Sequence, residues 1–249
     1  MNLQEIFDQL TYGELSQLSM GGGEPGVIDV TNYPRVLAHV NLGLTALYKR
    51  FPLKEGRLSL QLTAGLLTYN INNKFALSNE GSVEPVKYLL DTVTSPFAND
   101  VLKIERVLTD DGAELPINDL SNVYSVFTPT ATALCVPADI VAQVFELPDW
   151  LKTDKLELVY RANHPKITIG LTAFDPTATE LELPDSHLEP LLLFVASRAM
   201  TPMGAGQFEG LAGNNYFAKY EQACQHIELM NLRVDQGSQN TRLRNSGWA

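Results

Sequence analysis

The spacing of apolar residues changes twice along the chain, from a helical period to a strand-like period and back. In residues 3–51 the apolar positions lie three and four apart, which places them on one face of a helix. This pattern predicts helices over residues 3–10, 12–20 and 32–51. Their inward residues are Leu3, Ile6, Phe7 and Leu10, then Leu15 and Leu18, then Val36, Leu37, Val40, Leu44, Leu47, Tyr48 and Phe51.

Glycine and proline mark the ends of these helices. Residues 21–26 read GGGEPG and predict a sharp turn after the second helix. Pro34 falls in the first turn of the third helix, where its missing N–H costs nothing. Pro52 is expected to end that helix, because the residue before a proline is biased away from helical geometry.

Residues 56–184 have the shorter period of strands. Leu58, Leu60 and Leu62 alternate with polar residues, as expected for a half-buried strand. Asp110-Asp111-Gly112 predicts a hairpin turn. Further strands are expected over residues 66–71, 101–108, 124–127, 132–136, 155–162 and 166–170, and short helices over residues 86–90 and 138–145.

Helical spacing returns near Asp185. Ser186 and Glu189 stand at the spacing of a capping box, and the helix that follows should end before Pro202. Glycines in residues 204–213 predict a flexible connector. A last helix is expected from Asn214 or Asn215 to Arg233, with Phe217, Tyr220, Cys224, Ile227 and Met230 on one side.

These patterns predict an α+β protein in four parts. Residues 1–55 and 185–235 supply the N- and C-terminal halves of a helical bundle. Residues 56–184 form a large central β-rich insert between them. Residues 236–249 are polar, mildly basic and without periodicity, so we expect an extended C-terminal arm that is disordered when alone.

Composition and charge exclude some classes of function. The net charge is −11, which argues against a protein that coats nucleic acid, because phosphate binding needs clustered Lys and Arg. An acidic surface is compatible with a wall past which DNA slides without sticking. Cys135 and Cys224 are expected to be free thiols rather than a disulfide framework. The N-terminus lacks the basic region of a signal peptide, and the longest apolar run, residues 191–196, is too short to cross a membrane.

Motifs for chemistry are weak. The GGGEPG segment lacks the Lys-Ser/Thr of a phosphate-binding loop, and no strand precedes it. His39, His164, His187 and His226 stand at no metal-ligand spacing. We expect His39 and His226 on helix surfaces and His187 in a first turn. No metal or cofactor is predicted.

Other polar residues also have structural explanations. The acid pairs Asp110-Asp111 and Glu180/Glu182 fit solvated turns and strand edges better than acid–base catalysis. Ser186 has no GxSxG context that would mark a nucleophile. We therefore predict no catalytic residue and a protein that is not an enzyme.

The C-terminal arm has the strongest sequence signal for binding. Arg242, Leu243, Arg244 and Trp248 combine arginine with aromatic and aliphatic anchors in a segment with no fold of its own. Arg and Trp dominate interface energetics, and a disordered segment can order on a partner. An acidic groove would suit these residues.

The order of these features resembles the head-to-tail adaptor of short-tailed bacteriophages, a tail tubular protein A-like connector. The resemblance includes a short helix ending in a Gly-Glu-Pro turn (15–25) and a helix over residues 33–50 with Asn41 and Ala46 on its exposed side. It continues with an ELPIN element (114–118), the segment LPDSHLEPLLLFVASRAM (183–200), a Tyr/Glu-rich last helix (215–232) and an extended tail.

The resemblance implies a virion structural protein of the neck and tail, assembled in the host cytoplasm. Such adaptors form rings, usually dodecamers, between the portal protein and tail nozzle or tail fibre proteins, and surround the channel through which DNA is ejected without sequence-specific binding. Carried over, helices 32–50 and 186–202 pack the bundle. The arm, through Arg242, Leu243, Arg244 and Trp248, is the expected portal-binding part.

Two other classes stay open. In the first, the β-rich insert of a virion accessory module recognises a glycan or receptor, which would need an exposed aromatic platform. Tyr124, Phe127, Trp150 and Tyr160 are the candidates for it. In the second, the chain is a hydrolase with an unrecognised site, although no set of nucleophile, base and orienting group can be assembled from the sequence.

Overall fold

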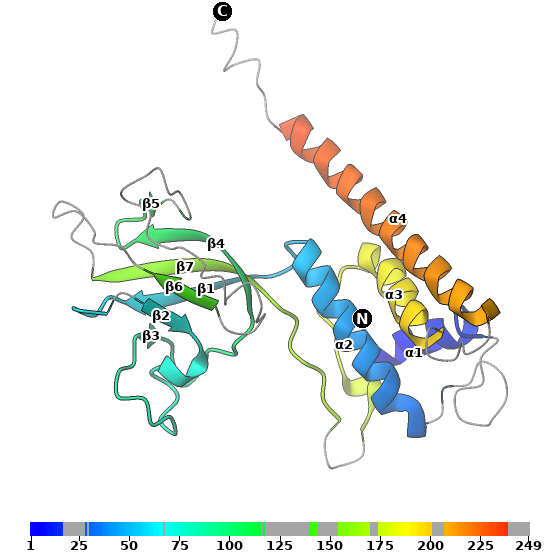
Figure 1. Ribbon diagram of the computed structural model, residues 1–249, viewed down its shortest axis with the longest axis horizontal. Helices are drawn as coiled ribbons and strands as arrows, with labels where there is room; N and C mark the ends of the chain where they lie inside the picture. The colour runs from blue at the N-terminus through cyan, green and yellow to red at the C-terminus, as the bar shows by residue number, and fades with distance from the viewer. Residues whose placement is uncertain are drawn as a thin grey trace, which may run out of the picture. The chain divides into compact units, whose positions relative to one another are not determined.

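The computed structural model describes residues 1–16, 28, 30–66, 68–115, 117, 140–143, 154–169, 174–200 and 207–238. The side chains of residues 140–143, 207–214 and 231–238 are not part of that description. The chain forms two compact units (Figure 1). Unit 1 comprises residues 1–47 and 166–249, and unit 2 comprises residues 48–165. Unit 1 holds the described α-helices except the last turn of one, and unit 2 holds the strands, so the predicted α+β class is confirmed.

Helix α1 (Leu3–Tyr12) buries all of its predicted inward residues. The Asn2 side chain accepts a hydrogen bond from the Glu5 backbone N–H at 2.9 Å, which caps the first turn. The helix ends at Gly13, whose N–H donates to the Gln9 carbonyl. The predicted helix over residues 12–20 is therefore wrong for residues 13–16, which form a turn, although Leu15 is buried as expected. Leu18 and the GGGEPG segment lie outside the described residues.

Helix α2 (Tyr33–Arg50) follows a 3-10 turn (Val30–Asn32) and has Pro34 in its first turn, as predicted. Its predicted apolar stripe is buried from end to end. The Asn41 side chain was expected on the exposed side of this helix, but it is half-buried. Its amide accepts from the Ile167 N–H at 3.0 Å and donates to the Ile167 carbonyl at 2.9 Å. Ala46 is half-buried as well.

Helix α3 (Leu188–Met200) is buried on every side over residues 190–197, as expected for a helix surrounded by others. It contacts α1 and α4. Gly43 brings α2 close to it, since a Cβ at this position would stand 2.7 Å from Leu191 Cδ1. The predicted capping box is replaced by a 3-10 turn (Asp185–His187), in which Ser186 Oγ lies 3.0 Å from His187 Nδ1.

Helix α4 (Gln207–Ser238) is longer at both ends than predicted. It runs through Gly210 and Gly213, where a connector was expected, and beyond Arg233 into the first residues of the predicted arm. Helix propensity is a weak prior that tertiary contacts override, and α4 packs along α3 through Tyr220, whose ring centroid lies 5.3 Å from that of Phe194. None of the described helices is long and apolar enough to span a membrane.

Unit 2 contains a five-stranded antiparallel sheet in the order β3-β1-β7-β4-β5. Strand β7 (Lys155–Ala162) is central and has the predicted bounds. It pairs with β1 (Glu55–Gln61) and β4 (Val101–Thr109), and the short strands β3 (Leu89–Leu90) and β5 (Glu114–Leu115) flank them. The predicted hairpin turn joins β4 to β5, with Gly112 at φ +79°. Strands β2 (Thr68–Ile71) and β6 (Ile140–Gln143) form a second, two-stranded sheet.

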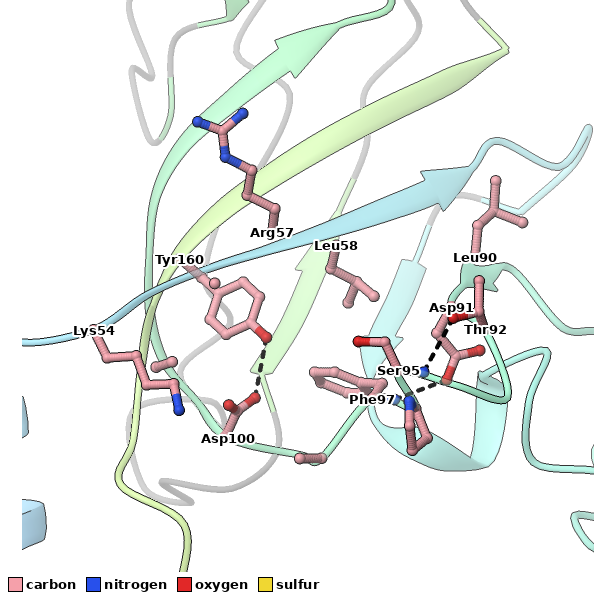
Figure 2. Close-up of a pocket in the computed structure, with 14 residues that line it drawn as sticks. Lys54, Arg57, Leu58, Leu90, Asp91, Thr92, Ser95, Phe97, Asp100 and Tyr160 are labelled. Carbon is pink, nitrogen blue, oxygen red and sulfur yellow. Dashed lines mark hydrogen bonds between the residues drawn. The ribbon is translucent and has the colours of Figure 1, made fainter. Parts of the chain in front are cut away.

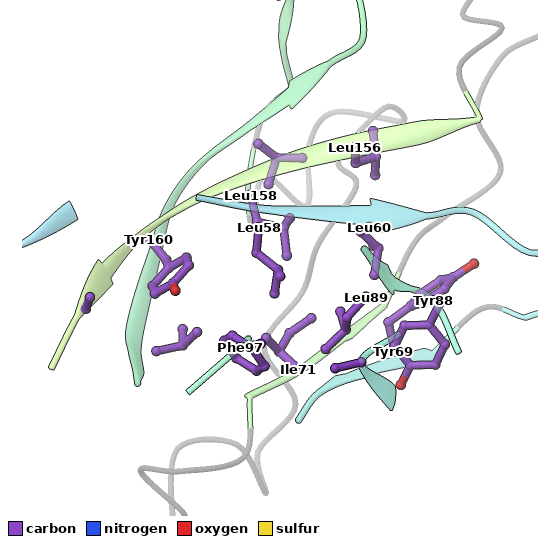
Figure 3. Packing of buried hydrophobic residues seen from close by; sticks show 14 of the residues in the cluster. Leu58, Leu60, Tyr69, Ile71, Tyr88, Leu89, Phe97, Leu156, Leu158 and Tyr160 are labelled. Carbon is purple, nitrogen blue, oxygen red and sulfur yellow. The ribbon is translucent and has the colours of Figure 1, made fainter. Parts of the chain in front are cut away.

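One face of the larger sheet supplies most of the unit 2 core (Figure 3). Inward residues alternate along β1 and β7, so Leu58 and Leu60 of β1 lie beside Leu156, Leu158 and Tyr160 of β7. Strand β2 and the segment that follows it close the core with aromatic side chains. The Tyr69 and Tyr88 rings meet edge to face, and the Phe75 and Tyr88 rings stack.

Three predicted elements of the insert are wrong. Residues 140–143 are a strand rather than a helix, and residues 89–90 are a strand preceded by irregular chain. Both are short apolar runs, for which periodicity cannot separate strand from helix. Residues 166–169 form no strand, because Asn41 satisfies the Ile167 backbone in place of a neighbouring strand. The expected strands over 124–127 and 132–136 lie outside the described residues.

The last turn of α2 belongs to unit 2. The Tyr48 ring meets the His164 ring edge to face, with centroids 5.6 Å apart. Arg161 of β7 donates to the Lys49 carbonyl at 2.7 Å, which satisfies a carbonyl at the helix end. The same guanidinium pairs with Glu105 at 2.8 Å. The sheet thus caps the C-terminus of α2.

Candidate functional site

Unit 2 has an open pocket of about 380 Å³ beside the first half of β1 (Figure 2). Three separate stretches of chain meet there: the start of β1, the segment that leads from β3 to β4, and the end of β7 with Tyr160 and Ala162. The lining residues are Lys54, Gly56, Arg57, Leu58, Leu90, Asp91, Thr92, Ser95, Pro96, Phe97, Ala98, Asp100, Tyr160 and Ala162. This mixture of aromatic rings, carboxylates and cations is suited to binding a polar group.

Tyr160 and Asp100 form one wall. The Tyr160 hydroxyl donates to Asp100 Oδ1 at 3.0 Å. Burial, together with the neighbouring Asp100 carboxylate, raises the pKa of Tyr160 well above its ordinary value. Tyr160 therefore stays a neutral donor at physiological pH. Its ring lies over Gly56, the residue opposite it on β1, because a Cβ there would stand 2.6 Å from Tyr160 Cε2.

Asp91 organises the opposite wall. Its carboxylate accepts from the Phe97 N–H at 2.8 Å and from both the N–H and the hydroxyl of Ser78. Burial acts to raise the pKa of Asp91, but these hydrogen bonds outweigh it, and the net pKa is lowered. The Thr92 hydroxyl stabilises the turn from Thr92 to Ser95 by accepting a hydrogen bond from the Ser95 N–H. Asp91 is thus a structural anchor of the pocket.

The cations of the pocket lie at its β1 side. Arg57 pairs with Glu157 at 3.2 Å and with Glu55 at 3.5 Å, and its side chain is 61% exposed. Exposed ion pairs of this kind stabilise a fold by little. The guanidinium can therefore change partners at small cost when another polar group approaches.

The pocket lining carries three hydroxyl groups and two carboxylates. Its hydroxyl groups, Thr92, Ser95 and Tyr160, have no histidine among the pocket residues to act as a base. Within the described ranges, no group of three or more His, Cys, Asp or Glu side chains could hold a metal ion.

The structure separates the histidines. His164 and His187 are buried, and His226 is exposed on α4 as expected. His187 lies in the turn before α3, as predicted. His39 differs from the prediction, because both of its ring nitrogens are shielded and have no hydrogen-bond partner in the described structure. Burial, and then the cations of Arg35 and Arg198, lower the pKa of His39.

Most of the binding residues predicted from sequence cannot be placed. The portal-binding candidates Arg242, Leu243, Arg244 and Trp248 lie outside the described residues. So do Tyr124, Phe127 and Trp150 of the aromatic platform and Cys135. Tyr160 is 6% exposed and packs against Phe97, so this residue is a pocket wall rather than a displayed ring. Cys224 is buried and forms no disulfide, as expected.

Sequence reasoning missed the pocket because no motif joins its parts. Asp91, Asp100 and Tyr160 come together only through the strand register. The available signal was Gly56, an isolated glycine in an alternating strand, which indicates a close approach of another group to the backbone.

No protein-family model matches the chain, and no curated protein matches it.

Proposed function

We propose that the chain is a non-enzymatic head-to-tail adaptor of a short-tailed bacteriophage, a ring-forming subunit between portal and tail that surrounds the DNA channel. The observation that carries the proposal is the interrupted helical unit. Residues 1–47 and 166–249 form one compact unit, and the chain leaves it through α2, builds the β unit and returns. This is the order of elements expected from the resemblance to such adaptors.

The packing around α3 supports the helical bundle of the proposal. α3 is buried on every side over residues 190–197, and α1, α2 and α4 each contact it. A helix of this kind needs neighbours all round, so the N- and C-terminal segments depend on each other for burial. A bundle built from both chain ends would give a ring subunit a rigid body.

Helix α4 offers a surface for assembly. Phe217, Leu229 and Met230 are all more than two-fifths exposed on this helix. Neighbouring apolar side chains that are exposed together, as Leu229 and Met230 are, are typical of an interface with another molecule. In a ring each subunit needs two different contact faces. The arm that follows α4 carries Arg242, Arg244 and Trp248, our candidates for portal contact.

The charge supports the channel role. At −11 the chain repels DNA on average, so a ring of such subunits would let DNA pass instead of holding it. Twelve such subunits around a channel would multiply this effect.

Co-assembly with the portal tests the proposal. Portal rings encoded by the same genome would be mixed with the full chain and with a chain lacking residues 239–249, which leaves α4 whole. Electron microscopy should show a second ring on the portal with the full chain only. The triple variant R242A/R244A/W248A should fail like the truncation, and a variant with Thr241, Asn245 and Ser246 changed to alanine should assemble.

Two results would contradict the proposal. One is a full chain that adds nothing to portal rings at any concentration while it binds defined glycans on an array, which favours the glycan-recognition alternative. The other is assembly that is unchanged by the truncation, which would refute the role of the arm but keep the ring.

A further inference from the structure

The pocket lies against an unpaired stretch of strand edge. β1 pairs with β7 along all of Glu55–Gln61, but on its other side β3 covers only Ser59 and Leu60. No described residue pairs with Glu55, Gly56 or Arg57 on that side. The pocket begins where β3 ends, and its lining includes Gly56, Arg57 and Leu58.

The direction of the backbone groups on this edge follows from the hydrogen bonds that β1 makes on its two sides. The Ala162 N–H donates to the Lys54 carbonyl and the Leu62 N–H to the Asp154 carbonyl, so even-numbered residues of β1 bond to β7. The Gln61 N–H donates to the Tyr88 carbonyl on the β3 side, so odd-numbered residues face the other way. The N–H and C=O of Glu55 and Arg57 therefore point to the open edge.

The other side of the sheet provides a contrast. β5 covers only Val107 and Leu108 of β4, so β4 also has an open stretch. That stretch is irregular, with register shifts at Val101/Lys103 and Ile104/Arg106. Bulges of this kind protect an edge against pairing. β1 keeps an unbroken register with β7 throughout and is therefore the edge that can accept a strand.

The side chains define what strand would fit. Inward from the edge, a residue opposite Gly56 would enter the pocket between Tyr160 and Phe97, near Asp100, whose carboxylate can accept further hydrogen bonds. A side chain with an apolar body and a donor at its tip, such as tyrosine, matches that lining. On the outer face, opposite charges favour cross-strand pairs, so an acidic residue suits Arg57 and a basic residue suits Glu55.

We propose that the β1 edge at residues 55–57 binds an extended peptide segment of a partner protein as an added antiparallel strand, in line with β3. The segment has the pattern acidic residue, tyrosine, basic residue, with the tyrosine in the pocket. Main-chain hydrogen bonds supply affinity and the pocket supplies specificity. The inference does not depend on the adaptor role.

A peptide titration tests this with the full chain. The probe is a fluorescent peptide that begins with Glu-Tyr-Lys and continues with threonines, because β3 already covers the edge at Ser59 and Leu60. The control peptides begin with Lys-Tyr-Glu or Glu-Glu-Lys. Arg57→Pro removes the outward N–H without touching the β7 ladder, and Arg57→Ala removes only the side chain. We expect Arg57→Pro to weaken binding about tenfold or more relative to Arg57→Ala, because it removes one hydrogen bond and obstructs the edge.

A second measurement needs no variant. On saturation with the probe, amide exchange should slow at Arg57 and Glu55, while the amides of Gly56 and Leu58, already bonded to β7, should not change. Failure of the wild-type chain to prefer the probe over both controls overturns the proposal. So does protection of even and odd amides alike. A wild-type dimer that Arg57→Pro turns into a monomer would assign the edge to a second copy and also overturn it.

Discussion

Gly56→Ala should destabilise unit 2 through the Tyr160 ring. An added Cβ would stand 2.6 Å from both Tyr160 Cε2 and the hydroxyl oxygen, which is closer than real contacts allow. The ring cannot move freely, because it packs edge to face on Phe97 and donates to Asp100. Overpacking costs about 1–3 kcal/mol, and loss of a hydrogen bond to a charged group costs about 1.5–3 kcal/mol.

We therefore expect Gly56→Ala to lower the free energy of unfolding by about 3 kcal/mol, measured by urea denaturation followed by far-UV circular dichroism. For a chain of this size that corresponds to about 6–12 °C in Tm. Tyr160→Phe, which keeps the ring and removes the hydroxyl, should lose only the hydrogen-bond part.

A double-mutant cycle decides whether the ring is the cause. In a Tyr160→Ala background the added Cβ meets no ring, so Gly56→Ala should cost less than about 0.5 kcal/mol or even stabilise, since alanine loses less backbone entropy than glycine. Equal costs in both backgrounds would refute the steric reasoning and point to a backbone requirement at Gly56 itself.

The remaining predictions concern three polar side chains. The pKa of His39 is lowered by burial and by two arginine cations, so the unfolded chain binds the proton more readily than the folded chain. The free energy of unfolding should therefore fall as pH drops below about 6.5. Thermal melts at pH 7.5 and pH 5 should show a smaller fall in Tm for His39→Leu than for the wild-type chain. Asn41→Ala removes both hydrogen bonds to Ile167 and should cost about 1–3 kcal/mol in denaturant; the matched control Leu42→Ala, at a position 55% exposed, should stay within about 0.5 kcal/mol. Because hydrogen bonds lower the pKa of Asp91, its stabilising contribution is present above its unfolded pKa of about 3.9 and lost as pH falls below that value; an equal acid-induced loss for Asp91→Asn would contradict this.

Local pattern was enough wherever burial and period agreed. The four inward residues of α1 and both ends of β7 were predictable, because one face of each element enters a core and the period alone identifies that face. The α2 stripe was predictable for the same reason. Pro34 in the first turn and Pro52 after the last turn also indicated where α2 begins and ends.

Prediction failed where a distant residue decides the local structure. Residues 166–169 stay irregular because Asn41 binds the Ile167 backbone, and no pattern near 166 reveals that partner. α4 continues through two glycines because it lies along α3. The pocket depends on the register that sets Tyr160 opposite Gly56. Register depends on two strands together, whereas the sequence pattern predicts each strand separately.

The division of unit 1 has a consequence for biosynthesis. Unit 2 is a continuous stretch, residues 48–165, whereas unit 1 needs both ends of the chain. During translation, α1 and the first turns of α2 emerge early with their apolar faces complete, but α3, against which they pack, emerges only after all of unit 2. Domains generally fold as units during synthesis, so the β unit should acquire its structure first. Until α3 has been synthesised, the apolar side chains of Leu3, Phe7 and Leu44 stay exposed on the N-terminal helices. A chaperone that binds apolar helices could bind them during this interval.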